Sequence, residues 1–175
     1  MEHIEKIRAL IPDVAKDIRI NLGNVLVPGT LSESQVWGVA LSSALAARSP
    51  ALAESFTAQA RTVNVPEGVL DDAKAAAVLM GMNNVFYRFR HMIGKEDYAQ
   101  RPARLRMQRL AQVTSTKADF ELFCLVVSAI NGCETCVSAH EKTVLDEGLS
   151  VDHVHDAVRI AATVQAAAIA LELNS

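Results

Sequence analysis

Apolar residues recur at steps of three and four along most of the chain, and this spacing constrains the fold more than any other feature. Near the N-terminus the spacing puts Ile4, Ile7 and Leu10 on one helical face, and it continues through residues 12–26. No segment alternates apolar and polar residues between turn signals over the length of a strand. The sequence therefore predicts an all-α fold.

Start and stop signals divide this pattern into separate helices. Ser32 and Gln35 have capping-box spacing before a nearly all-apolar helix, expected over about 32–48. With 175 residues, half of them hydrophobic, the chain can bury the core of one domain, residues 1–175. The other expected boundaries are helices starting at Pro50 and Pro66, a helix near 103–111, a last helix over about 151–173, breaks at Asn83-Asn84 and Gly94, and an exposed loop over 95–101.

The two halves of the chain resemble each other, each as a long helix, a short helix and a long helix. Trp37 aligns with Phe123 at a shift of 86 residues, and Asp72 aligns with Asp156 at a shift of 84. We therefore expect an internal duplication of a helical unit whose copies pack about a pseudo-twofold axis. The approximate repeats are residues 31–94 and 117–173.

Only the second copy would carry chemically reactive residues. At the shift of 86 residues, the first-copy counterparts of its two cysteines and its histidine are Ala47, Pro50 and Glu54. None of these three side chains is a thiol or an imidazole. The first copy is therefore expected to be scaffold.

Charge and hydropathy argue against nucleic-acid or membrane partners. The formal net charge is −3, and no run of like charges occurs. The apolar stretches Leu122–Ile130 and Ile160–Leu171 are too short to span a bilayer, and the N-terminus lacks the apolar core of a signal peptide. A cytoplasmic location is expected. Basic residues between Arg88 and Arg109 are more typical of a solvated face or of contacts between protomers than of a binding patch.

Cys133 and Cys136 form a Cys-x-x-Cys pair at the expected start of a helix, directly after Asn131-Gly132. This spacing permits a disulfide, and the freed amide groups and dipole of the new helix stabilise a thiolate. His140 follows Cys136 by four residues and so lies on the same helical face, where it can exchange a proton with the thiol. Glu121, twelve residues before Cys133, would have to fold across to orient His140.

The residues alone leave thiol redox chemistry, metal binding and chance occurrence open, because an isolated Cys-x-x-Cys is a weak signal. Zinc could recruit both cysteines, His140 and one of His153 or His155, but no second cysteine pair is present. Covalent haem is excluded, because it needs a histidine directly after the second cysteine, where Val137 stands. Cys124, within an apolar run, is more typical of a packed core thiol.

The pattern Glu-x11-Cys-x2-Cys-x3-His resembles the AhpD family of alkyl hydroperoxide reductases, within the carboxymuconolactone decarboxylase-like superfamily. The resemblance extends to Trp37-Gly38, to the Met-Gly-Met-Asn-Asn-Val-Phe-Tyr-Arg run over 80–88, and to the run over 127–133. It implies an all-helical fold with an internal duplication, and a homotrimer. The chain departs from the family at Thr135, where well-studied members carry a histidine.

The resemblance also implies roles for the site residues. The residue matching Cys136 would be the peroxidatic thiol that becomes a sulfenic acid, and Cys133 would resolve it as a disulfide and donate a proton. His140 and Glu121 would form a proton relay. Electrons would come from dihydrolipoamide on a lipoylated dihydrolipoamide acyltransferase recharged by dihydrolipoamide dehydrogenase, with no bound cofactor. The same dithiol would reduce the partner peroxiredoxin, AhpC.

The leading functional hypothesis is therefore an antioxidant thiol peroxidase and disulfide reductase acting on organic hydroperoxides. One alternative is a disulfide reductase that serves the peroxiredoxin and has no peroxidase activity of its own. Another is a helical scaffold with a structural zinc site. A decarboxylase acting on a cyclic lactone is the weakest alternative, since that chemistry does not need paired thiols.

Overall fold

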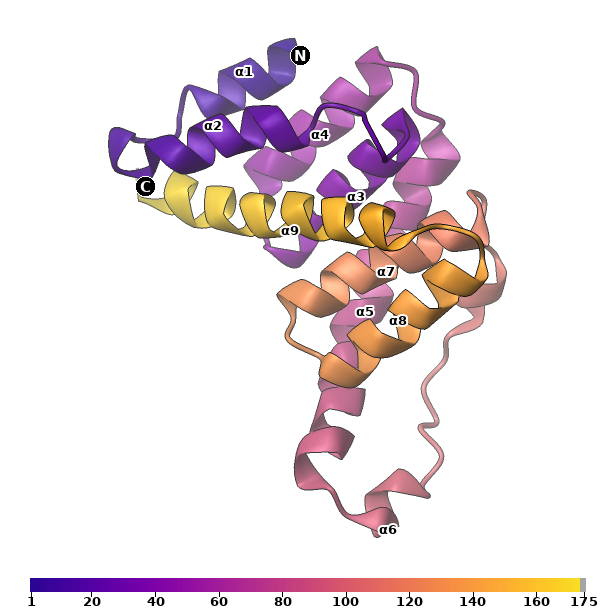
Figure 1. Cartoon of the computed structure of the whole chain (residues 1–175). Helices are drawn as coiled ribbons and strands as arrows, with labels where there is room; N and C mark the ends of the chain where they lie inside the picture. Colours follow the sequence, from indigo (N-terminus) through magenta and orange to yellow (C-terminus); the bar gives the residue numbers. More distant parts are fainter. Residues whose placement is uncertain (174–175) are drawn as a thin grey trace.

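The computed structural model describes residues 1–173 of the chain, and this range contains helices but no strand (Figure 1). The all-α prediction is confirmed. Two short 3₁₀ turns, η1 (Asp13–Ala15) and η2 (Gln108–Ala111), accompany the α-helices. The α-helices are α1 (Glu2–Arg8), α2 (Lys16–Val25), α3 (Glu33–Ala46), α4 (Pro50–Thr62), α5 (Glu67–Ile93), α6 (Glu96–Ala99), α7 (Lys117–Ile130), α8 (Glu134–Asp146) and α9 (Val151–Glu172).

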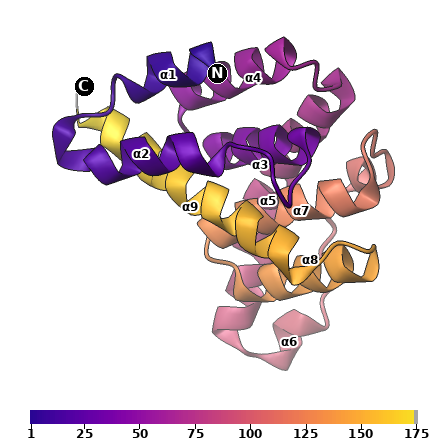
Figure 2. The same ribbon diagram turned by 45° about the horizontal axis from the view of Figure 1, so that its top comes forward.

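Helix α3 is the centre of the core and packs against α4, α5, α7 and α9 (Figure 2). Every residue over 35–44 is buried, as its nearly all-apolar sequence predicts. The predicted capping box is confirmed: the Ser32 amide donates to Gln35 Oε1 at 2.9 Å, and the Gln35 amide donates to Ser32 Oγ at 3.3 Å. Gly38 lets α3 and α7 approach closely, since a Cβ at this position would lie 2.1 Å from Cζ of Phe123.

Helix α9 packs as a core helix against α2, α3 and α7. This helix has 22 residues and is therefore longer than the apolar stretch over 160–171, which is itself too short to span a membrane. By length and composition alone the whole helix could cross a membrane. Eight of its residues, most of them alanines, are nevertheless buried within the protein. Small side chains allow this close packing, which explains the high alanine content.

Helices α7, α8 and α9 each begin 84 residues after α3, α4 and α5, respectively. The shift of 86 residues used for the first helices is therefore wrong by two. The counterparts of Cys133, Cys136 and His140 become Ser49, Leu52 and Phe56 in place of the sequence-based assignments Ala47, Pro50 and Glu54. The internal duplication itself remains a prediction that this offset favours.

Three expectations for the chain after Pro66 differ from the structure. Helix α5 runs without a break through Asn83-Asn84, because both asparagines are buried and Asn84 is paired through its side chain. The expected helix near 103–111 is reduced to η2, and the expected loop over 95–101 contains the short helix α6. The end of α5, α6 and the following segment form an arm that projects from the helical body (Figure 1).

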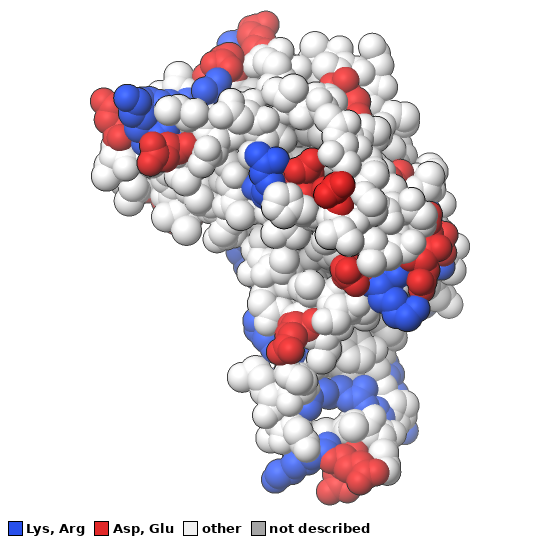
Figure 3. Space-filling model, viewed as in Figure 1, with Lys and Arg blue, Asp and Glu red and all other residues white. Residues whose placement is uncertain are grey.

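Asp72, fully buried in α5, ties the end of this arm back to the body. Its carboxylate accepts hydrogen bonds from Arg109, from the Thr114 amide at 2.9 Å, and from the Ser115 amide and hydroxyl at 2.7 Å each. Burial alone would raise the pKa of Asp72, but these hydrogen bonds outweigh it and lower the pKa below its ordinary value. Arg109 is thus a structural partner and not part of a solvated basic face, whereas other basic side chains lie exposed along the arm (Figure 3).

Candidate active site

The turn between α7 and α8 places the two cysteines. Gly132 adopts the left-handed conformation with φ of 66°, which lets the chain reverse after α7. Its amide donates to the Ala129 carbonyl at 3.1 Å, and the Cys133 amide donates to the Ser128 carbonyl at 3.0 Å. Cys133 is the N-cap of α8, so both sulfur atoms lie at the positive end of that helix.

Cys133 and Cys136 are joined by a disulfide, with Cα atoms 5.3 Å apart. The structure therefore represents the oxidised chain. Cys133 is fully buried, whereas Cys136 keeps 7% of its surface exposed. An incoming molecule reaches Cys136 before it reaches Cys133.

The structure brings Glu121 of α7 and His140 of α8 into direct contact. His140 Nδ1 lies 2.6 Å from Glu121 Oε2, and the two side chains are 17% and 19% exposed, His140 first. On the other side of the imidazole, Nε2 lies 3.2 Å from the thioether sulfur of Met80 in α5. The ring is thus held from both sides, and its Nδ1 proton would be directed to the carboxylate.

Cys136 and His140 both line a pocket of about 230 Å³ between α5 and α8. Cys133 and Glu121 do not line it, so the pocket presents one cysteine and one imidazole. Met80, Tyr87 and Ala139 supply largely apolar walls suited to an organic group. The remaining lining residues are Asn83 and Thr135.

A polar network from α5 supports the turn that precedes Cys133. The buried Asn84 donates to Ser128 Oγ at 2.9 Å and accepts from Asn131 Nδ2 at 2.9 Å. Arg88 donates to the Asn131 carbonyl. The sequence did not predict these roles, because paired asparagines are typical of a helix break. The two asparagines interrupt a helical pattern of apolar residues that continues on both sides, and this continuity could have indicated that they lie within one helix.

The departure from the family at Thr135 leaves a hydroxyl beside Cys133. Thr135 Oγ1 lies 3.7 Å from Cys133 Sγ, and the residue is exposed at the pocket edge. A hydroxyl at this position is neutral, whereas a histidine can carry positive charge. Thr135 can therefore form a weak hydrogen bond but cannot stabilise a thiolate by charge.

The other candidate residues lie away from this cluster or are unreactive. Cys124 is fully buried in α7, and desolvation, with smaller contributions from Glu121 and Asp72, raises the pKa of its thiol well above the ordinary value. His153 caps α9 by accepting from the Ser150 amide at 3.2 Å. No group of three metal-ligating side chains comes together within residues 1–173.

Comparisons with known proteins give the family that the sequence resembles, and the similar proteins match nearly the whole chain. A profile described as "Carboxymuconolactone decarboxylase family" matches residues 96–173. A protein of Anaeromyxobacter sp. (strain K) named "Alkyl hydroperoxide reductase AhpD" is 56% identical over 173 residues, 99% of this chain and 92% of that protein. Proteins of the same name from Rhodospirillum centenum and Solibacter usitatus are each 45% identical over 172 residues, 98% of this chain and 92% and 97% of theirs.

Proposed function

Because the chain belongs to the AhpD family of alkyl hydroperoxide reductases, within the carboxymuconolactone decarboxylase superfamily, and is an oxidoreductase, we propose that it reduces organic hydroperoxides with the Cys133–Cys136 pair. One observation carries this proposal. Cys136 lines a largely apolar pocket beside His140, while the buried Cys133 lies within disulfide distance behind it.

The reaction begins with the reduced pair. The Cys136 thiolate attacks the distal oxygen of the hydroperoxide, the O–O bond breaks, and the departing alkoxide takes a proton to leave as an alcohol. Cys136 is now a sulfenic acid. The Cys133 thiol then attacks this sulfur, water leaves, and the disulfide seen in the structure is formed.

His140 and Glu121 would manage the protons in these steps. His140 lies on the pocket wall with Cys136, where it can take the thiol proton and return it to the departing alkoxide. The Glu121 carboxylate, 2.6 Å from Nδ1, would orient the ring and stabilise the imidazolium. Met80 on the far side restricts rotation of the ring.

The test is hydroperoxide turnover with dihydrolipoamide as the reductant. Cys136→Ser should abolish alcohol formation, and His140→Gln should slow it by about 10²-fold or more, the usual contribution of a positioned acid–base group. An undiminished rate in Cys136→Ser would exclude the assigned nucleophile. Cys124→Ala serves as the control for removing a cysteine outside the site.

The electron donor and the partner proteins follow from the same proposal. Dihydrolipoamide, carried by a lipoylated dihydrolipoamide acyltransferase and recharged by dihydrolipoamide dehydrogenase, would reduce the disulfide. The regenerated dithiol would also reduce the peroxiredoxin AhpC. We place this cycle in the cytoplasm, where thiols are kept reduced on average.

A disulfide reductase without peroxidase activity is the second candidate, and the neutral Thr135 beside Cys133 favours it. The two functions separate when hydroperoxide consumption is compared with and without the peroxiredoxin. Consumption that depends entirely on the peroxiredoxin would favour the second candidate. Thr135→His should then raise the intrinsic rate if the missing charge is the cause.

We further propose that the chain is a homotrimer that self-associates through an apolar stripe on α5. Val78, Val85 and Met92 follow each other at seven-residue steps and are 75%, 61% and 77% exposed, with Phe89 beside them at 46%. Exposed apolar side chains in such a row are typical of contacts between protomers. Sedimentation equilibrium of Val85→Glu against the wild type tests this, and an unchanged mass would exclude the stripe as the contact.

A further inference from the structure

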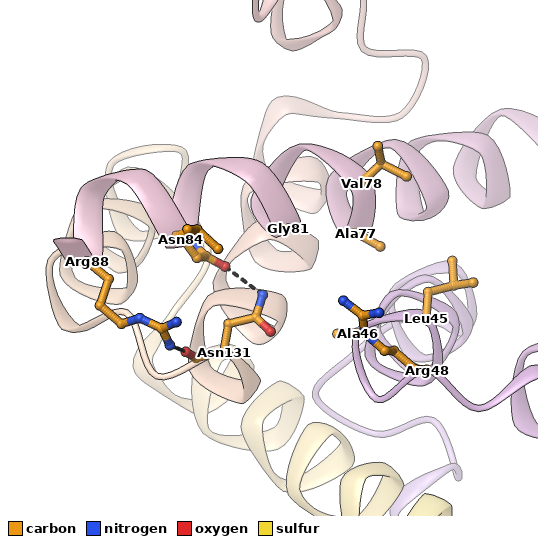
Figure 4. A pocket seen from close by; sticks show the side chains of 10 residues that line it. Leu45, Ala46, Arg48, Ala77, Val78, Gly81, Asn84, Arg88 and Asn131 are labelled. Carbon is orange, nitrogen blue, oxygen red and sulfur yellow. Dashed lines mark hydrogen bonds between the residues drawn. The ribbon is translucent and has the colours of Figure 1, made fainter. Parts of the chain in front are cut away.

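A second and larger pocket lies on a different side of α5 from the cysteine pair. Its volume is about 530 Å³, and it opens between the end of α3, the middle of α5 and the end of α7 (Figure 4). It shares no lining residue with the pocket that contains Cys136. The proposed reduction of hydroperoxides therefore assigns no ligand to this pocket.

The polar lining of this pocket is positively charged. Arg48 and Arg88 approach it from opposite sides with Asn131 between them (Figure 4). No aspartate or glutamate is among the lining residues, so the two guanidinium charges are not neutralised within the pocket. The other lining residues are Leu45, Ala46, Ala77, Val78, Gly81, Asn84 and Val85.

Arg48 is exposed, and its side chain has no partner within the described residues. It follows α3 in the left-handed region with φ of 55°, where residues other than glycine are uncommon. Its side chain makes no hydrogen bond, ion pair or ring contact within residues 1–173. All five of its N–H groups are therefore available to a ligand.

Arg88 is anchored on the facing side. One of its N–H groups donates to the Asn131 carbonyl, and Asn131 Nδ2 in turn donates to the buried Asn84 Oδ1 at 2.9 Å. This is its only side-chain hydrogen bond within the described part of the chain, so further N–H groups remain for a ligand. The anchoring reduces the side-chain entropy that Arg88 would lose when a ligand binds.

We propose that this arginine pocket, formed around Arg48 and Arg88, binds a small anion that carries a carboxylate or phosphate group. The planar guanidinium presents paired N–H groups that match the oxygen atoms of either group. Ala46, Ala77 and Gly81 leave room between the arginines for the body of a small molecule. The site is separate from the pocket that contains Cys136, although Asn84, Arg88 and Asn131 also support the turn before Cys133.

The pocket also borders the proposed contact between protomers, because Val78 and Val85 belong to both. A carboxylate side chain of a second copy is thus the competing occupant. The two possibilities differ in their effect on assembly. A small anion would bind without changing the oligomeric state, whereas a protein carboxylate would make that state depend on Arg48.

Isothermal titration of the full chain at low ionic strength, with inorganic phosphate and with succinate, tests the proposal. We expect saturable binding of at least one of them, weakened about tenfold or more in Arg48→Gln, as expected for a lost charged hydrogen bond. Arg48→Lys should restore part of the affinity. Arg104→Gln is the matched control, since Arg104 is also exposed, has a positive φ of 50°, and lies outside the pocket.

The relative affinities for phosphate and succinate would identify the preferred group. The absence of saturable binding of both anions would overturn the proposal, as would equal affinity in Arg48→Gln. Sedimentation velocity of the same samples measures the oligomeric state and so tests whether a carboxylate of a second copy occupies the pocket. If Arg48→Gln lowers the oligomeric state and the wild type binds neither anion, a carboxylate of a second copy fills the pocket.

Discussion

Replacement of Gly38 by alanine should destabilise the protein, although alanine is the better helix former. The added Cβ would lie 2.1 Å from Cζ and 2.4 Å from Cε1 of Phe123, a ring that is fully buried. Overpacking of this kind costs about 1–3 kcal/mol, and the closeness of this contact puts it at the upper end. The gain in helix propensity offsets about 1 kcal/mol. We expect a net loss of about 2 kcal/mol, or about 4–8 °C in Tm for a chain of this size.

Equilibrium urea unfolding and calorimetry of the reduced protein measure this loss. Gly81→Ala is the control, because an added Cβ there meets nothing within 4 Å, so the helix gain of about 1 kcal/mol should appear alone. The double variant with Phe123→Leu should be destabilised by less than the sum of the two single variants, because the smaller side chain relieves the clash. A Gly38→Ala variant as stable as the wild type would refute the close approach of α3 and α7.

Three further predictions concern buried polar and thiol groups. Asn84→Ala should cost about 1–3 kcal/mol in urea unfolding, because it leaves the buried Ser128 hydroxyl without its donor, and Asn84→Asp should not restore the lost stability. The lowered pKa of Asp72 stabilises the fold above the ordinary aspartate pKa of about 3.9, and this contribution is lost as the pH falls through the folded value. The stability gap between the wild type and Asp72→Asn should therefore narrow from pH 7 to pH 3, and a constant gap would contradict this account. In the reduced native chain Cys136 should react with a thiol reagent and Cys124 should not, since Cys124 is buried and its thiol pKa is raised; rapid reaction of Cys124 would contradict its placement.

The sequence predicted what depends on spacing along one helix. The all-α fold, the family and the capping box at Ser32 are confirmed, because helical periodicity and cap chemistry are local properties. Cys133 caps α8, and Cys136 and His140 lie within it four residues apart, so the common face of Cys136 and His140 could be read from the chain. Their catalytic roles remain predictions.

Contacts between different helices could not be predicted from the sequence. The pairing of Glu121 with His140 could be suggested only as a possibility, and no local pattern indicated the contact between Met80 and the imidazole. Asn84 was expected to break a helix because nothing local reveals that Ser128 and Asn131 satisfy its side chain. The expected helix near 103–111 is reduced to η2, and the side chains of this segment are exposed or half-buried on the arm.

The 84-residue offset places an aromatic pair where the second copy has its acid and imidazole. Trp37 and Phe56, the counterparts of Glu121 and His140, are buried with ring centroids 6.3 Å apart. Under the predicted duplication, the same backbone arrangement supports an apolar contact in one half and a polar one in the other. Under the proposed function, the second half gives up packing stability for reactivity, so replacing Glu121 and His140 by an apolar pair should yield a more thermostable and inactive protein.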